Sequence, residues 1–175
     1  MESTNPVYRF VITVAIGYFA FQFMDLLLFE WAFTAKYWAL VYHFVLQCVI
    51  YPAYWMFKQL GYEVYKTYDI LWIADTKGVR VDRVCIGVDL IANLIILISA
   101  YPGKLKSKLL IIPLGILLMV ALNSLRIWAI LYGQVNHSNY AKYDFHYSYN
   151  LVVYIVIFLM WVLYVNLNPK VGKKT

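Results

Sequence analysis

The chain has 175 residues, of which 63% are hydrophobic, 19% aromatic and 14% charged, and its mean hydropathy is +0.66. Soluble domains are about half apolar and about a quarter charged, so this composition excludes a soluble domain, a disordered chain and a fibrous protein. The formal net charge of +6 does not indicate nucleic-acid binding, because much of it lies in lysine clusters beside apolar runs. Two cysteines, Cys48 and Cys85, are too few for a disulfide framework.

Five apolar runs follow one another along the chain, and we interpret each as a membrane-spanning helix. Only a helix satisfies all of its own backbone hydrogen bonds inside hydrocarbon, so the runs predict an all-α, polytopic helix bundle in a single transmembrane domain. The first run contains Asp25, and its length and the lack of a cleavage site after it favour a retained helix over a signal peptide. The predicted helices cover about residues 10–29, 37–57, 86–100, 109–132 and 149–167.

One segment, about residues 58–84, has a different composition, in which charged residues are mixed with Tyr, Val and Ile. Its two apolar-rich stretches, 68–74 and 79–84, flank the turn-forming sequence Asp75-Thr76-Lys77-Gly78. Alternating stretches around a short turn of this kind predict a hairpin, which we place outside the membrane.

Two lysine clusters indicate how the helices cross the membrane. One cluster lies between the third and fourth spans and the other follows the fifth span, so both must lie on the same side, which the positive-inside rule makes cytoplasmic. The hairpin, the 133–147 loop and the N-terminus are then expected outside. The two clusters consist of Lys104, Lys106 and Lys108, and of Lys170, Lys173 and Lys174.

Three reactive side chains are predicted at one depth in the membrane. Cys85 opens the third span, Arg126 lies late in the fourth, and His146 precedes the fifth. The midpoint between Cys85 and Arg126 falls in the cytoplasmic turn, so an antiparallel hairpin places both residues about 30 Å from that turn. The midpoint between Arg126 and His146 falls in the outer loop, so His146 returns to the same level. All three are therefore expected near the outer interface.

Polar residues accompany each of these three at helical spacing, and polar faces in a membrane point into the bundle. A thiolate attacks acyl carbons well, a histidine can take the thiol proton and later protonate a leaving amine, and an arginine favours the thiolate and can stabilise an oxyanion. The set therefore suits acyl transfer or peptide cleavage. The accompanying residues are Asp89 and Asn93, Asn123, and Asn150.

Other interpretations of these residues stay open. Cys85 alone would be an ordinary small apolar residue, Arg126 an interface anchor, and His146 part of a tyrosine-rich interfacial belt. His137 is a rival for the histidine role. His43 and Cys48, five residues apart on another helix, form another possible pair, which we interpret as core residues. One histidine and one cysteine fall short of a tetrahedral metal site, so neither a metal nor a cofactor is predicted.

The sequence resembles the exosortase/archaeosortase family between about residues 83 and 165. The resemblance rests on Val84-Cys85-Ile86-Gly87, on Asn123-Ser124-Leu125-Arg126-Ile127 and on His146 before the last span. The family commonly has a serine where Ile86 stands. The short length and the tyrosine-rich tail are similar to the compact exosortase F type.

The resemblance implies a membrane cysteine protease/transpeptidase of the bacterial cytoplasmic (inner) membrane, with its active site on the extracytoplasmic side. Cys85, Arg126 and His146 would be catalytic, and Gly87, Asp89, Asn123 and Asn150 would support them or bind substrate. The substrate would be a membrane protein with a C-terminal sorting signal, and water or a surface glycan or lipid would be the acceptor. The alternatives are a small transporter or channel lined by Asp25, Asp89 and Arg126, and a non-catalytic membrane assembly subunit.

Overall fold

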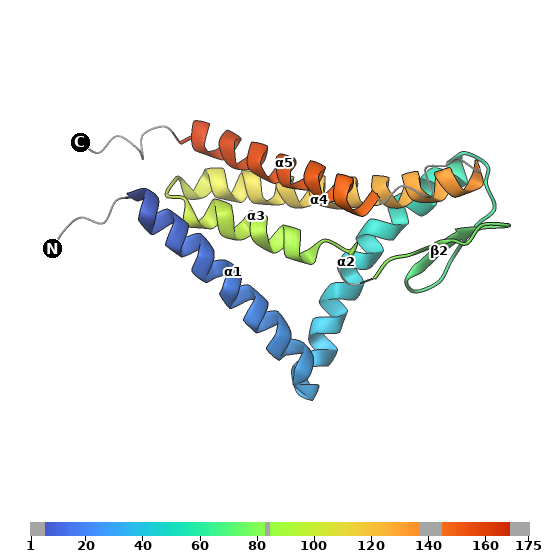
Figure 1. Ribbon diagram of the computed structural model, residues 1–175, viewed down its shortest axis with the longest axis horizontal. Coiled ribbons are helices and arrows are strands. Elements are labelled where there is room, and N and C mark those ends of the chain that lie inside the picture. The colour runs from blue at the N-terminus through green and yellow to red at the C-terminus, as the bar shows by residue number, and fades with distance from the viewer. Residues whose placement is uncertain (1–5, 83–84, 137–144, 169–175) are drawn as a thin grey trace. The chain divides into compact units, whose positions relative to one another are not determined.

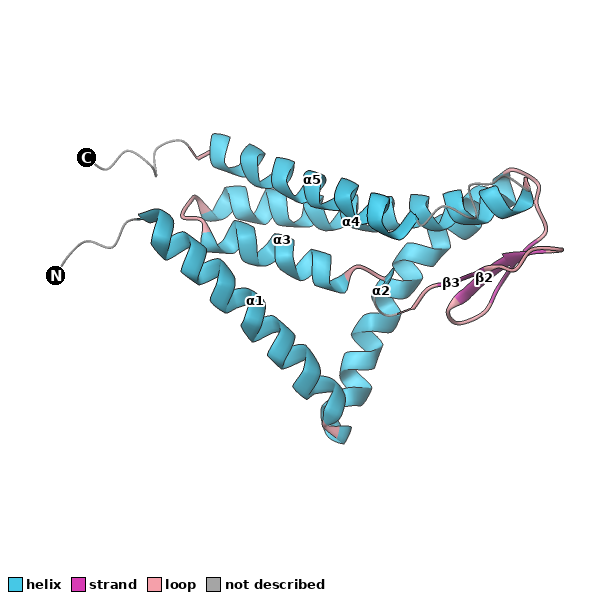
Figure 2. Ribbon diagram, in the orientation of Figure 1, coloured by secondary structure: helices cyan, strands magenta, loops and turns pink. Residues whose placement is uncertain are grey.

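A computed structural model describes residues 6–82, 85–136 and 145–168, and most of the described chain is helical (Figures 1 and 2). The helices are α1 (Pro6–Glu30), α2 (Ala32–Gln59), α3 (Val88–Ala100), α4 (Leu105–Val135) and α5 (Phe145–Asn166). Three short strands, β1 (Val64–Lys66), β2 (Ile70–Ile73) and β3 (Val79–Arg80), lie between α2 and α3 in the sequence. The predicted all-α membrane bundle of five helices is confirmed.

Four of the five helices are long and apolar enough to cross a membrane. These candidate spans are Val7–Glu30, Thr34–Gln59, Leu105–Val135 and Tyr149–Asn166. The third helix, α3, has 13 residues and is therefore only about 20 Å long, which is shorter than the hydrocarbon core of a bilayer. It begins two residues later than predicted, because Cys85 and Ile86 belong to a turn that precedes it.

The chain forms two compact units, and α2, α4 and α5 contribute to both. The first unit contains residues 1–39, 89–116 and 155–175. Within it, the buried carboxylate of Asp25 accepts a 2.7 Å hydrogen bond from the indole N–H of Trp38. The side chain of Asn168 accepts a 3.0 Å hydrogen bond from the backbone N–H of Lys104, just before α4. Both contacts satisfy buried polar groups in an otherwise apolar bundle.

The second unit, residues 40–88 and 117–154, contains the strands and the candidate site. Its sheet has the order β1-β2-β3 with both pairs antiparallel, and Ile70 lies opposite Arg80. The predicted hairpin around Asp75–Gly78 is therefore present as β2 and β3, and β1 adds a strand that the sequence pattern did not predict. The Ser124 hydroxyl of α4 donates a 2.8 Å hydrogen bond to the Val49 carbonyl of α2, which ties these helices together.

Candidate active site

Cys85 lies in a tight turn directly before α3. Its backbone N–H donates a 2.8 Å hydrogen bond to the carbonyl oxygen of Asp82. Two residues later, Gly87 has a φ of 83°, in the left-handed region that glycine adopts at low cost. The helix then begins at Val88, so the turn presents Cys85 at the end of α3, half-buried and with a free thiol.

The side-chain amide of Asn123 connects this turn to two helices. Asn123 lies on α4 with only 3% of its surface exposed, and its Nδ2 donates a 3.3 Å hydrogen bond to the Ile86 carbonyl. Its Oδ1 accepts a 3.0 Å hydrogen bond from the Tyr149 hydroxyl on α5. A Cβ atom at Gly87 would collide with the Nδ2 atom of Asn123. The glycine therefore supplies both the backbone conformation and the space that this amide needs.

Arg126 lies three residues after Asn123 on α4, on the same side of the helix. Its guanidinium carbon is 4.9 Å from the centroid of the Tyr149 ring, which is within the range of a cation–π interaction. Tyr149 thus contacts both polar residues of α4, one through its hydroxyl and the other through its ring. The half-buried guanidinium of Arg126 is therefore held beside the turn that carries Cys85.

Cys85, Asn123 and Arg126 line one cavity of about 50 Å³. This volume is far below the roughly 300–1,000 Å³ of most small-ligand sites, so the cavity fits a reacting group better than a whole substrate. Strand β3 and the residue after it form another wall, which is the part of the chain that leads into the Cys85 turn. The remaining lining residues are Val79, Arg80, Val81, Ile127 and Ile130.

The cavity is lined by a thiol, a carboxamide and the guanidinium groups of Arg80 and Arg126, and its other lining side chains are apolar. A thiol beside a fixed cation can act as a nucleophile, and the cation can stabilise negative charge on an attacked carbonyl oxygen. Among the residues that the structure describes, no group of three His, Cys, Asp or Glu side chains is placed to hold a metal ion. Together, the thiol, the Arg126 guanidinium and the carboxamide can support acyl transfer at the thiol.

The structure brings some of the predicted site residues together and leaves others apart. Cys85, Gly87, Asn123 and Arg126 belong to one local arrangement. His146 lies in the first turn of α5, three residues before Tyr149, and its side chain is outside the described part of the structure. The lining of the described cavity does not include Asp89, in the first turn of α3, or Asn150 of α5; the rival His137 lies outside the described residues.

Tyr149 belongs to the site, although the sequence pattern did not identify it. The tyrosine-rich stretch around His146 is typical of an interfacial belt, whereas Tyr149 within it contacts both Asn123 and Arg126. Its spacing of three residues from His146 is the signal that could have identified it, because residues at this spacing share a helix face. The β3 wall was also missed, although β3 lies only five residues before Cys85.

Comparison with known families adds one match. Residues 6–163 match the model of a family described as transmembrane exosortase, which covers most of the chain. No curated protein and no solved structure shows significant similarity to the chain.

Proposed function

The chain belongs to the transmembrane exosortase family, and from this premise we propose that it is a membrane-embedded cysteine protease/transpeptidase. In this proposal it cleaves the C-terminal sorting signals of surface or exported proteins, with Cys85, Arg126 and His146 as the catalytic residues. Family membership supports a membrane transpeptidase or protease role. The single observation that supports Cys85 and Arg126 in these roles is that the two residues, distant in sequence, line one small cavity.

The proposed reaction uses each side chain for one step. His146 takes the proton of the Cys85 thiol, and the thiolate sulfur attacks the scissile carbonyl carbon. Arg126 stabilises the oxyanion of the tetrahedral intermediate, and His146 then protonates the leaving amine as the C–N bond breaks. The resulting thioester is released by water or by an acceptor nucleophile on a surface glycan or lipid, and the thiol is regenerated.

Two further contacts support Arg126 in this role. The Tyr149 ring holds the guanidinium, and Asn123 ties Tyr149 to the turn that carries Cys85. His146 precedes Tyr149 by three residues in α5, and residues at this spacing share a helix face, which supports its inclusion in the proposed site. Preorganised charges and donors of this kind are the main source of transition-state stabilisation in acyl transfer.

The position in the cell is proposed from the lysine clusters. Lys104, Lys106 and Lys108 lie at the start of α4, and the second cluster, residues 170–174, lies outside the described residues. If both clusters face the cytoplasm of a bacterial cell, the Cys85 turn and the β-sheet face outward. A substrate with a recognition motif outside the inner membrane would then meet Cys85 directly.

The test is expression of wild-type, Cys85→Ala and Cys48→Ala proteins in the native host, followed by size analysis of C-terminally anchored surface proteins. We expect uncleaved, membrane-anchored precursors to accumulate only with Cys85→Ala, since Cys48 lies in α2 and serves as the matched control. If the Cys85→Ala cells process the same proteins as the wild type, the catalytic proposal is wrong. The transporter or assembly alternatives should then be tested, beginning at Asp89.

A further inference from the structure

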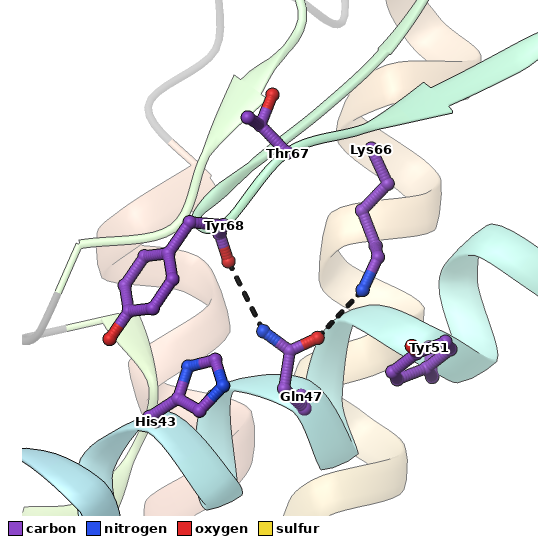
Figure 3. Close-up of a pocket in the computed structure, with 6 residues that line it drawn as sticks. All are labelled: His43, Gln47, Tyr51, Lys66, Thr67 and Tyr68. Atoms are coloured by element: carbon purple, nitrogen blue, oxygen red, sulfur yellow. Dashed lines mark hydrogen bonds between the residues drawn. The ribbon is translucent and has the colours of Figure 1, made fainter.

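A second hollow lies in the same unit as Cys85 but is lined by different residues (Figure 3). It is a groove of about 470 Å³ between the middle of α2 and the loop that joins β1 to β2, a volume in the range of small-ligand sites. The groove is lined by His43, Gln47 and Tyr51 of α2 and by Lys66, Thr67 and Tyr68 of the strand and loop.

The polar side chains of this groove are held in place by one another. Gln47 donates a 3.2 Å hydrogen bond to the Tyr68 carbonyl and accepts a 2.7 Å hydrogen bond from the Lys66 ammonium (Figure 3). The ammonium nitrogen also lies 3.8 Å from the centroid of the Tyr51 ring. The Lys66 ammonium is therefore positioned by two contacts, with Gln47 and with the Tyr51 ring. Gln47 is itself held by its hydrogen bond to the Tyr68 carbonyl.

The charge of Lys66 is not neutralised by these contacts, since an amide and an aromatic ring are both uncharged. Among the described residues that line the groove, none carries a carboxylate. Arg80, in contrast, is paired with Asp69 at 2.9 Å and with Asp82 at 3.6 Å. A fixed ammonium without an acidic neighbour is a site that attracts an anion.

His43 adds a second group that can bind an anion. Its ring stacks on the Tyr68 ring with the centroids 4.6 Å apart and the planes 11° from parallel. Its Nδ1 atom is buried and has no hydrogen-bond partner among the described residues. A buried polar atom without a protein partner is costly, and a ligand oxygen can satisfy it when this nitrogen carries the proton.

The surface beside the groove indicates what kind of anion would bind. Leu40, Phe44, Tyr51 and Trp55 are exposed and lie along one face of α2, with Gln47 in the middle of that face. This helix is long and apolar enough to span a membrane, so an exposed apolar face on it is suited to lipid chains. Tyrosines such as Tyr51 and Tyr68 are favoured at the level of lipid headgroups.

We propose that this groove binds the phosphate-bearing headgroup of an anionic phospholipid. Lys66 and His43 contact the phosphate, and the acyl chains lie along the exposed face of α2 at Phe44 and Leu40. A free phosphate or a peptide carboxylate would use the charge of the groove without the apolar face beside it. The proposal goes beyond the proposed function and is independent of whether Cys85 is a nucleophile.

The groove is connected to the Cys85 cavity through one ion pair. Tyr68 lines the groove, and the next residue, Asp69, pairs with Arg80, which lines the cavity. A lipid bound at Lys66 and Tyr68 would therefore order the loop that positions one wall of the candidate active site.

The experiment uses the full-length protein in detergent, titrated with a fluorescent phosphatidylglycerol and, separately, with a diacylglycerol that carries the same fluorophore. We expect phosphatidylglycerol to bind at least about tenfold more tightly, because a charge-assisted hydrogen bond to Lys66 contributes only with the phosphate. Lys66→Gln should remove this preference. Gln47→Glu, which keeps an acceptor for Lys66 but adds a repelling carboxylate, should do the same if Lys66→Gln fails to fold.

Lys58→Gln is the matched control, because it removes the same charge from an exposed position at the end of α2. It should change the affinity for phosphatidylglycerol by less than about twofold. Equal losses in Lys66→Gln and Lys58→Gln would show diffuse surface attraction and overturn the proposal. Displacement of phosphatidylglycerol by equimolar inorganic phosphate, or by a short acetylated peptide with a free carboxylate, would overturn it as well.

Discussion

Asn123 on α4 accepts a 3.0 Å hydrogen bond from the Tyr149 hydroxyl on α5, and the other end of the same amide donates to the turn that carries Cys85. The buried side chain of Asn123 therefore connects the Cys85 turn to Tyr149, and the Tyr149 ring contacts Arg126. The Cys85 turn and the Arg126 helix are distant in sequence, and this amide is a direct contact between them. Changes at Asn123 and its neighbours should affect activity and stability together.

Gly87→Ala should displace the Asn123 amide. The alanine methyl would collide with Nδ2, and the φ of 83° alone costs a non-glycine residue about 1–2 kcal/mol. Gly61→Ala is the control, because Gly61 has a φ of 81° with no atom within 4 Å of the added methyl. We expect thermal unfolding to show a loss of stability at Gly87 that exceeds the loss at Gly61 by at least about 1 kcal/mol. Equal losses would show that backbone strain, and not contact with Asn123, is the cause.

Asn123→Asp keeps the shape of the side chain but cannot donate to the Ile86 carbonyl. The loss of a buried donor and the burial of a carboxyl group should destabilise the protein by about 1–3 kcal/mol and reduce processing of anchored precursors. Asn136→Asp is the control, since Asn136 is exposed directly after the same helix and its side chain donates to the Tyr132 carbonyl. If Asn123→Asp processes precursors at the rate of the control, the amide is not needed to align the site.

Tyr149 makes two contacts that substitutions can separate. Tyr149→Phe removes the hydrogen bond to Asn123 and keeps the ring beside Arg126, so we expect a loss of about 1 kcal/mol in stability. Tyr149→Leu also removes the cation–π contact, which contributes about 0.5–2 kcal/mol. Processing should therefore fall in the order wild type, Tyr149→Phe, Tyr149→Leu. Tyr154→Phe, on an exposed part of the same helix, should behave as wild type.

The apolar runs predicted the five helices because hydrocarbon permits no other backbone arrangement for such segments. Counting residues from the shared turn also predicted that Cys85 and Arg126 lie at the same depth, since the rise per residue is nearly constant in helices. The same counting does not give the rotation of a helix about its axis. The hydrogen bond between Tyr149 and Asn123 depends on that rotation and could not be predicted.

The sequence predicted β2 and β3 but not β1, and the reason lies in the turns between the strands. The turn between β2 and β3 has an Asp-Thr-Lys-Gly sequence that signals its position, and it was predicted. The turn between β1 and β2 is Thr67-Tyr68-Asp69, closed by a 2.9 Å hydrogen bond from the Thr67 N–H to the Ile70 carbonyl, and it contains no glycine or proline. This loop packs against α2, where the Tyr68 ring stacks on the part-buried His43 ring and the two residues line the groove.

The orientation of the chain can be measured at its two cysteines. We expect a membrane-impermeant maleimide to label Cys85 in intact cells that carry Cys48→Ala, because the positive-inside rule places Cys85 at the outer face. Cells that carry both Cys48→Ala and Cys85→Ala give the background labelling, because the chain then contains no cysteine. Labelling of Cys85 only after the membrane is disrupted would reverse the proposed orientation.

The last prediction concerns how the β-sheet presents the substrate. Strand β3 lines the Cys85 cavity, and an extended recognition motif could pair with a strand edge beside it. The turn before β3 is tied to α4 by a 3.1 Å hydrogen bond from the Gln134 side chain to the Gly78 carbonyl. Deletion of residues 75–78 should therefore abolish processing, and Gln134→Ala should weaken it.

Labelling of the Cys85 thiol distinguishes a loss of substrate recognition from a disrupted active site. In the deletion variant, the maleimide should still label Cys85 at close to the wild-type rate, because the Cys85 turn is also anchored by Asn123. Loss of both labelling and processing would mean that the hairpin supports the turn structurally. Unchanged processing after deletion would show that the substrate is recognised elsewhere on the protein.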